Sequence, residues 1–293
     1  MRIRASVAVV TGALALTALA VPAAQADGRG NLAAHIPTLT KSSTGFKAAP
    51  SVADAPADET LGDTQITSVS VNAGKDIVVG VSAKKTFTVS VTATDPNGIY
   101  DAFPVLWHGP DMDNIDGVIE PTTIDNDQVG SCTAVNATTS TCKVTMVADP
   151  LDNIYSNILA GTWKVWVGAA GNDGDYVIKD AYKTARVQRY SKLTVNASPE
   201  PVYKGKTITV TGKLSRANWD DLQYHGYANQ YVKLQYRKSG SSTYTTLKTI
   251  KSDSYGNLKT TTTASADGYY RYSFAGTTTT PAVNATGDFV DVK

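Results

Sequence analysis

The stretch GTWKVWVGAAGNDGDYVIKD, residues 161–180, decides the fold class. Trp163, Val165 and Val167 alternate with other residues, which places their three side chains on one face of a strand. The turn sequence NDGD, residues 172–175, follows, and an apolar run then returns along the chain. Two such runs joined by a short Asn-, Asp- and Gly-rich turn are typical of an antiparallel β-hairpin.

The same alternation extends to both sides of this hairpin. Apolar residues occupy every second position in KTFTVSVTAT (85–94), STCKVTMVA (140–148), KTITVTGKL (206–214), YVKLQYR (231–237) and GYYRYSFAG (268–276). The turn DPNG at 95–98 has a mechanism, because Pro fixes φ and Asn-Gly tolerates positive φ. Only PLDNIYSNILAG (150–161) has a helical spacing, enough for one or two turns. Short strands at intervals of about ten residues predict an all-β protein built of β-sandwiches.

Charge divides the chain into two domains. Residues 63–190 hold nine Lys and Arg against fifteen Asp and Glu, whereas residues 191–293 hold thirteen against seven. We therefore predict an acidic sandwich over 63–190 and a basic one over 191–293. Residues 27–62 are rich in Ala, Pro, Ser, Thr and Asp without a sustained period, which predicts a flexible or disordered arm.

The N-terminus carries an export signal. Arg2 and Arg4 precede the uncharged apolar run 5–21, and Ala24-Gln25-Ala26 supplies the small residues of a cleavage site. We predict a signal peptide over 1–26 and a secreted, extracellular product without a membrane span. A transmembrane anchor is the alternative, although the run is short for one.

Export favours a disulfide between the only two cysteines, Cys132 and Cys142. A catalytic thiol or a metal-binding pair is the alternative, and neither has a His or a second cysteine pair nearby in the sequence. Closing a loop this short would stabilise the fold by roughly 2.5–3 kcal/mol in the chain-entropy model.

Longer stretches of the second half resemble a known group of proteins. SKLTVNASPEPVYKGKTITVTGKLSRANW (191–219), VKLQYRKSGSSTYTTLKTI (232–250) and GYYRYSFAGTTTTPAVNATGDFVDV (268–292) are similar to immunoglobulin-like domains of secreted proteins from streptomycete-type bacteria. DPNGI (95–99) and AGTWKVWV (160–167) resemble companion domains in the same proteins, less specifically. The resemblance implies two immunoglobulin-like sandwiches in tandem and export. Members are mostly uncharacterised, and some carry a calcium-binding label.

Calcium is the one cofactor that the residues suggest. The stretch DMDNIDG at 111–117 looks like the start of a calcium loop, but the EF-hand register fails, since Ile115 stands at position 5 and Thr122 at position 12. Sandwich domains can still bind calcium where loops meet. The candidate oxygen ligands are Asp111, Asp113, Asp116, Asp125 and Asp127. The alternative is a solvated acidic loop.

Motifs for catalysis are sparse. His35 lies in the arm, so only His108 and His225 are available to a folded site, and each is more typical of packing at a loop edge. The sequence contains no G-x-S-x-G elbow, P-loop or zinc-spaced His cluster. A small secreted hydrolase is therefore a secondary hypothesis only.

Binding is the leading functional hypothesis. The inter-strand stretch ANWDDLQYHGYANQY (217–231) holds Trp219, Tyr224, Tyr227 and Tyr231, whose rings can stack on sugars or anchor a protein. The alternative is that this loop folds back and caps the sandwich. Lysines spread along strands favour soluble edges over nucleic-acid binding. We predict a non-catalytic interaction protein that binds a cell-envelope, glycan or protein partner through its loops, with a calcium-binding protein as the alternative.

Overall fold

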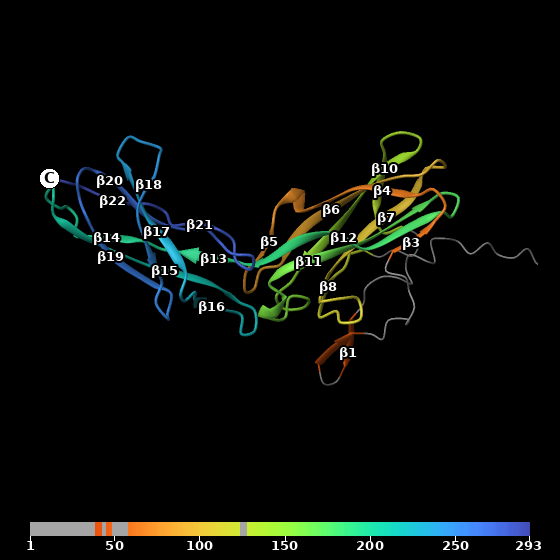
Figure 1. Cartoon of the computed structure of the whole chain (residues 1–293), viewed down its shortest axis with the longest axis horizontal. Helices are drawn as coiled ribbons and strands as arrows, with labels where there is room; N and C mark the ends of the chain where they lie inside the picture. The colour runs from red at the N-terminus through yellow and green to blue at the C-terminus, as the bar shows by residue number, and fades with distance from the viewer. Residues whose placement is uncertain (1–38, 43–44, 49–57, 124–127) are drawn as a thin grey trace, which may run out of the picture.

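The chain folds into two β-sandwiches that lie end to end (Figure 1). The computed structural model describes residues 39–42, 45–48, 58–123 and 128–293. Among these residues, no helix is both long and apolar enough to cross a bilayer. The predicted signal peptide and most of the predicted arm lie outside the described residues.

The first sandwich packs a four-stranded sheet on a larger one. The four-stranded sheet has the order β4-β6-β10-β9, and all its pairs are antiparallel. The larger sheet has the order β3-β12-β11-β7-β8, and β5 runs parallel to the end of β12. The strands are β3 Asp58–Leu61, β4 Gln65–Val71, β5 Ile77–Val79, β6 Lys85–Thr94, β7 Ile99–His108, β8 Gly117–Ile119, β9 Ser131–Ala134, β10 Thr139–Ala148, β11 Gly161–Gly171 and β12 Tyr176–Arg189. Two 3-10 turns, η1 Asn72–Gly74 and η2 Asn157–Leu159, interrupt the connections.

The second sandwich repeats this plan with shorter strands. One sheet joins β13, β14, β16 and β19 to the long central strand β15, and the other has the order β18-β17-β20-β21, with β22 also on β20. The strands are β13 Ser191–Leu193, β14 Asn196–Ser198, β15 Thr207–Asn218, β16 Gln223–Gly226, β17 Tyr231–Lys238, β18 Thr245–Lys251, β19 Asn257–Thr263, β20 Gly268–Phe274, β21 Val283–Asn284 and β22 Asp288–Val290.

The strand order identifies both units as immunoglobulin-like. In the first unit, β4, β6, β10 and β9 form one sheet in that order, and β7, β11 and β12 form the centre of the other. These sets correspond to strands A-B-E-D and C-F-G of the immunoglobulin arrangement. In each unit a short early segment pairs in parallel with the C-terminal end of that unit, through Ile77↔Val187 of β5 and β12 in the first and through the isolated bridge Val202↔Val292 in the second. The predicted fold class is therefore confirmed.

Two cores follow from the alternation of apolar residues. Phe87, Val89 and Val91 are buried in the first unit, as predicted, and Tyr270, Tyr272 and Phe274 are buried in the second. Removing these side chains from water is the main driving force for each fold.

The central strand β11 is buried on both faces over most of its length, although alternating strands usually expose one face to solvent. Trp163 and Val165 are buried, but Trp166 on the other face is buried as well, 5.6 Å from the ring of Phe103. The charged residue of that face, Lys164, is used internally: its Nζ donates to the carbonyls of Gly109 and Pro110 and lies 4.2 Å from the centre of the Trp107 ring. One face of β11 therefore carries a lysine without being a free surface.

The structure corrects one predicted boundary and one predicted helical segment. The arm was expected to reach residue 62, but β3 pairs with β12 through Asp58–Leu61, so the first sandwich begins earlier. Earlier still, β1 (Leu39–Ser42) and β2 (Gly45–Ala48) form an antiparallel pair. The helical spacing of 150–161 produces only the 3-10 turn η2, because the chain turns back there into β11.

The predicted disulfide is confirmed. Cys132 of β9 and Cys142 of β10 stand directly opposite each other and are bonded. Beside them, the carboxylate of Asp101 accepts hydrogen bonds from the backbone N–H groups of Val129 (2.7 Å) and Gly130 (2.9 Å). The bond and the carboxylate together fasten the segment that leads into β9.

We expect the double variant Cys132→Ser/Cys142→Ser to lose about 2.5–3 kcal/mol of unfolding free energy, because the bond closes a loop whose ends are separated by 10 residues. Urea denaturation of the variant against the wild type measures the loss, with the reduced wild type as control. Two free thiols in non-reducing mass spectrometry would contradict the bonded state.

Candidate functional site

Backbone hydrogen bonds run across the junction of the two sandwiches. The chain crosses at Tyr190, between β12 and β13, where Tyr190 N–H donates to the Val79 carbonyl (2.8 Å) and Ala217 N–H donates to the Tyr190 carbonyl (2.8 Å). Next to it, Arg189 N–H donates to Thr279 of the second sandwich (2.9 Å). These bonds tie the neighbouring strands of both units to the crossing point.

Trp219 is the centre of this junction. It comes from the second sandwich, yet it is only 2% exposed and belongs to the hydrophobic core of the first. Its indole N–H donates to the carbonyl of Gly80 (3.0 Å), and its backbone N–H donates to the side chain of Asn157 (3.0 Å). The prediction that Trp219 offers its ring to a partner is therefore wrong, because the first domain already covers that ring.

The two predicted tyrosines are also engaged within the chain. Tyr224 is half-buried, lies edge-on to Tyr190 and carries the amine of Lys192 3.5 Å from its ring centre. Tyr227 is half-buried against Phe274 and is covered by the guanidinium of Arg216 at 3.8 Å. The loop thus caps its own sandwich and the junction, as the alternative interpretation held.

A carboxylate completes the junction. Asp220 accepts hydrogen bonds from the hydroxyl of Ser156 (2.9 Å) and the backbone N–H of Asn157 (3.0 Å), at the start of η2 in the first sandwich. Partial burial opposes ionisation, but these hydrogen bonds outweigh it and lower the pKa of Asp220. Burial also lowers the pKa of the neighbouring Arg189 to about 10, so this guanidinium stays charged at neutral pH.

The predicted calcium ligands do not converge where the structure describes them. Asp111 accepts from Asp113 N–H and from the amide of Asn114, within a local turn. Asp116 pairs instead with His108. Asp125 and Asp127 lie outside the described residues. In the described part of the chain, Asp111, Asp113 and Asp116 do not form a group of carboxylates close enough to share a metal.

A different carboxylate cluster forms at the far end of the first sandwich. The carboxylates of Asp95, Asp173 and Asp175 offer oxygens within 4.8 Å of one another, where the DPNG turn meets the NDGD turn. Each is already used by the protein: Asp95 accepts from Thr64 (2.6 Å), Asp175 from Asp63 N–H (2.9 Å) and Asp173 from the Asn97 amide. These bonds account for the cluster as a clasp between turns, and calcium binding by the acidic domain stays a prediction.

Both histidines of the folded domains bond to aspartates. His108 Nδ1 lies 2.5 Å from Asp116, and His225 Nε2 lies 2.6 Å from Asp221. Within the residues that the structure describes, neither ring hydrogen-bonds a serine or threonine hydroxyl. The pairs therefore lack a nucleophile in direct contact.

A surface that combines exposed rings with several cations lies on the second sandwich. It is the outer face of strands β18, β17, β20 and β22, and we call it the aromatic–arginine face. Tyr231 is 71% exposed and Phe289 is 39% exposed, and Lys233 and Lys251 are exposed beside them. The face comprises Tyr231, Lys233, Gln235, Arg237, Tyr244, Thr249, Lys251, Tyr269, Arg271, Ser273 and Phe289.

Its rings and guanidinium groups are stacked in a row. Arg271 lies 3.7 Å from the centre of the Tyr244 ring, and Arg237 lies 4.1 Å from that of Tyr269. Tyr269 in turn packs against Phe289 at 5.1 Å. Gly287 has no side chain to collide with Tyr244, whose hydroxyl would lie 2.3 Å from a Cβ at that position. The row is thereby held in place by contacts between its own members.

Sequence reasoning missed this face, although its signal was present. Tyr231, Lys233 and Arg237 occupy the outward positions of β17, and Tyr269 and Arg271 those of β20. The alternation placed Lys233 and Arg237 in water, and Tyr231 was grouped with the aromatic stretch 217–231. Only the pairing of β17 with β20 brings the two sets together.

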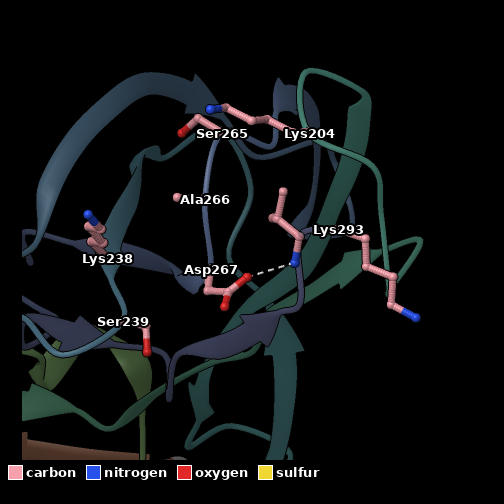
Figure 2. Close-up of a pocket in the computed structure, with 8 residues that line it drawn as sticks. Lys204, Lys238, Ser239, Ser265, Ala266, Asp267 and Lys293 are labelled. Atoms are coloured by element: carbon pink, nitrogen blue, oxygen red, sulfur yellow. Dashed lines mark hydrogen bonds between the residues drawn. The ribbon is translucent and has the colours of Figure 1, made fainter.

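Two shallow hollows lie elsewhere on the described part of the chain. One of about 350 Å³ lies at the free end of the second sandwich, and Figure 2 shows that Lys204, Lys238 and Lys293 extend from different sides of it. Its Asp267 already accepts from Val292 N–H (2.8 Å). The other, of about 580 Å³, lies beside the junction and includes Asp76, Tyr190 and Pro281. Neither gathers rings and cations as the aromatic–arginine face does.

Comparisons with known proteins place no family name on the chain. No protein-family model and no curated protein matches it. Among solved structures, the D00–D0 domain of intimin is similar to this chain at 16% sequence identity and a TM-score of 0.26. The alignment covers 76% of this chain and 98% of the intimin chain. The alignment with the adhesin InvE of Yersinia pseudotuberculosis covers 76% of this chain and 58% of the InvE chain, at 15% identity and a TM-score of 0.25. The alignment with the mouse nectin-like molecule 4 ectodomain covers 77% of this chain and 64% of that chain, at 14% identity and a TM-score of 0.22. At these TM-scores the likeness carries no argument about function, and the fold assignment rests on the strand order.

Replacing Trp219 by Ala should cost about 3–5 kcal/mol of unfolding free energy, because it leaves a cavity at the junction and orphans the Gly80 carbonyl. Chemical denaturation measures this loss, with Tyr231→Ala, at an exposed ring, as the matched control. Equal stability of the two variants would show that the indole does not hold the domains together.

Acid should weaken the junction through Asp220. A carboxylate with a lowered folded pKa stabilises above the ordinary Asp range, about 3.9, and loses this effect as the pH falls through the folded pKa. We expect Asp220→Asn to be less stable than wild type at pH 6 and to lose less stability between pH 6 and pH 3. Asp221→Asn, which removes a neighbouring carboxylate bound to His225, is the control. Identical pH profiles for wild type and Asp220→Asn would refute this role.

Proposed function

We propose that this chain is an exported, non-catalytic binding protein whose partner docks on the aromatic–arginine face. The observation that carries the proposal is the row of stacked rings and guanidinium groups on the outside of the second sandwich. Rings and arginines are the residue types that dominate binding energy in interfaces.

The position of the row on β-strands supports a binding role. Strands β17 and β20 are paired from Val232↔Phe274 to Lys238↔Gly268. The backbone of paired strands is already ordered, so no loop has to be fixed when a partner binds, which lowers the cost of association. The predicted loop of residues 217–231 offers less, because the rings of Trp219, Tyr224 and Tyr227 are already used within the chain.

The non-catalytic part of the proposal rests on the chemistry of the histidines. Each is held by an aspartate, and catalysis by such a pair needs a positioned nucleophile or substrate-binding cavity beside it. Export agrees with the disulfide, since such bonds persist in oxidising compartments.

Co-sedimentation of the full protein with a cell-envelope fraction of the producing cell tests the proposal. We expect retention of the wild type and at least about tenfold weaker retention of Tyr231→Ala/Phe289→Ala, because exposed aromatic anchors supply most of the contact energy. Tyr203→Ala/Tyr255→Ala is the matched control, since both rings are 72% exposed but lie off the face.

Two results would contradict the proposal. Equal retention of both double variants would remove the face from the binding event. Reproducible turnover of any substrate in a hydrolase panel would overturn the non-catalytic assignment.

A further inference from the structure

The chemistry of the aromatic–arginine face selects a class of partner. We propose, on the basis of the function proposed above, that its occupant is a carboxylated polysaccharide. The argument combines the charge of the face, the fixed geometry of its guanidinium groups, and the spacing of its cations.

Charge on the face has a single sign. Strands β17, β18 and β20 contain no Asp or Glu, whereas Lys233, Arg237, Lys251 and Arg271 lie on their outer side. The one carboxylate of β22, on Asp288, accepts a hydrogen bond from Ala197 N–H (2.6 Å) and so points toward β14. A surface of this kind attracts anions and disfavours neutral or cationic partners.

The guanidinium groups are prepared for carboxylates. The guanidinium carbons of Arg237 and Arg271 lie 4.1 Å and 3.7 Å from the centres of tyrosine rings, and each group donates to one neighbour, the Ser241 carbonyl (2.5 Å) and Gln235 Oε1 (2.9 Å) respectively. An arginine has five N–H donors in a planar fork that matches the two oxygens of a carboxylate. The ring contact and the hydrogen bond already restrict each side chain, so less entropy is lost on binding.

The remaining side chains suit a sugar ring. The exposed ring of Tyr231 offers a flat apolar face of the kind on which the C–H face of a sugar packs. Thr249 and Ser273 stand on either side of Lys233 and supply hydroxyl groups that can hydrogen-bond those of a sugar.

The cations are spread evenly along the face. Lys251 stands opposite Tyr231 and Arg271 opposite Gln235, so together with Lys233 and Arg237 the four charges follow one another at every second position of β17. From the level of Lys251 to that of Arg237 is six residues, or about 20 Å at a rise of about 3.3 Å per residue. A single small acid cannot span this row of charges, whereas a chain with repeated carboxylates can.

A single-stranded nucleic acid is the rival polyanion. It needs ring faces on which successive bases stack. Here Tyr244 and Tyr269 already carry guanidinium groups on their faces, and Phe289 packs against Tyr269. Tyr231 is the most exposed ring of the face, and the amine of Lys251 lies 5.9 Å from its centre. The face therefore has one ring for a sugar unit but no run of open rings for successive bases.

Binding of the full protein to polygalacturonate, measured by calorimetry, tests the inference. We expect binding at low salt that weakens as salt rises, no binding to neutral dextran, and weaker binding to oligo(dT) than to polygalacturonate. Lys233→Gln/Lys251→Gln should weaken polygalacturonate binding at least about tenfold, because two charge contacts are lost.

Two further variants separate the site from net charge. Lys213→Gln/Lys259→Gln removes the same two charges from the outer face of the opposite sheet, on β15 and β19, and should leave binding within about twofold. Arg237→Lys/Arg271→Lys keeps the charge but removes the planar fork, and should also weaken binding at least about tenfold.

Each contrary outcome has a defined meaning. Absence of polygalacturonate binding, equal losses in the two lysine pairs, or tighter binding of oligo(dT) would overturn the carboxylated-polysaccharide assignment. If envelope retention still depends on Tyr231 and Phe289 in that case, the proposed binding function stands and only the partner class falls. If that retention is also absent, the proposed function falls with it.

Discussion

The burial of Trp219 in the core of the neighbouring domain is the contact on which the rest of the molecule depends. One indole from the second sandwich fills the end of the first, and its N–H satisfies a carbonyl there. Backbone bonds around Tyr190 and the carboxylate of Asp220 surround this contact. Two domains that share a core residue are held at a fixed spacing, and the stretch 219–230, which contains β16, supplies the rings that do so.

This use of the loop determines where a partner has room to bind. With Trp219, Tyr224 and Tyr227 engaged, the rings that remain displayed are those on strands and short turns. The proposed binding surface is therefore a sheet face, whereas the prediction from sequence was a loop. The difference from the prediction has a simple cause. Aromatic side chains beside a domain boundary are removed from water by packing on the adjacent domain, so they are no longer exposed to a partner.

The fold was predictable because its signals are local. Alternation in residues 85–94 and 268–274, the DPNG and NDGD turns, and two cysteines ten positions apart each act over a few residues, and all agree with the structure. The site was not, because its parts meet only through pairing. Trp219 reaches Gly80 across 139 positions, and Asp95 meets Asp173 only because two turns share one end of the sandwich. Counting aspartates in 111–127 measures local charge, and charge by itself does not make side chains converge.

The two outer faces of the second sandwich differ in a way that solubility does not explain. The outer face of β15 and β19 presents threonines, among them Thr207, Thr209 and Thr261, with Lys213 and Lys259 at its end. Hydroxyls and a few lysines are sufficient to keep a sheet in water. The face of β17 and β20 carries large rings instead, and a ring that is 71% exposed, as Tyr231 is, gains little from folding. An exposed ring that contributes little to the stability of its own domain, set beside a row of rings and arginines, is what the proposed binding role would require.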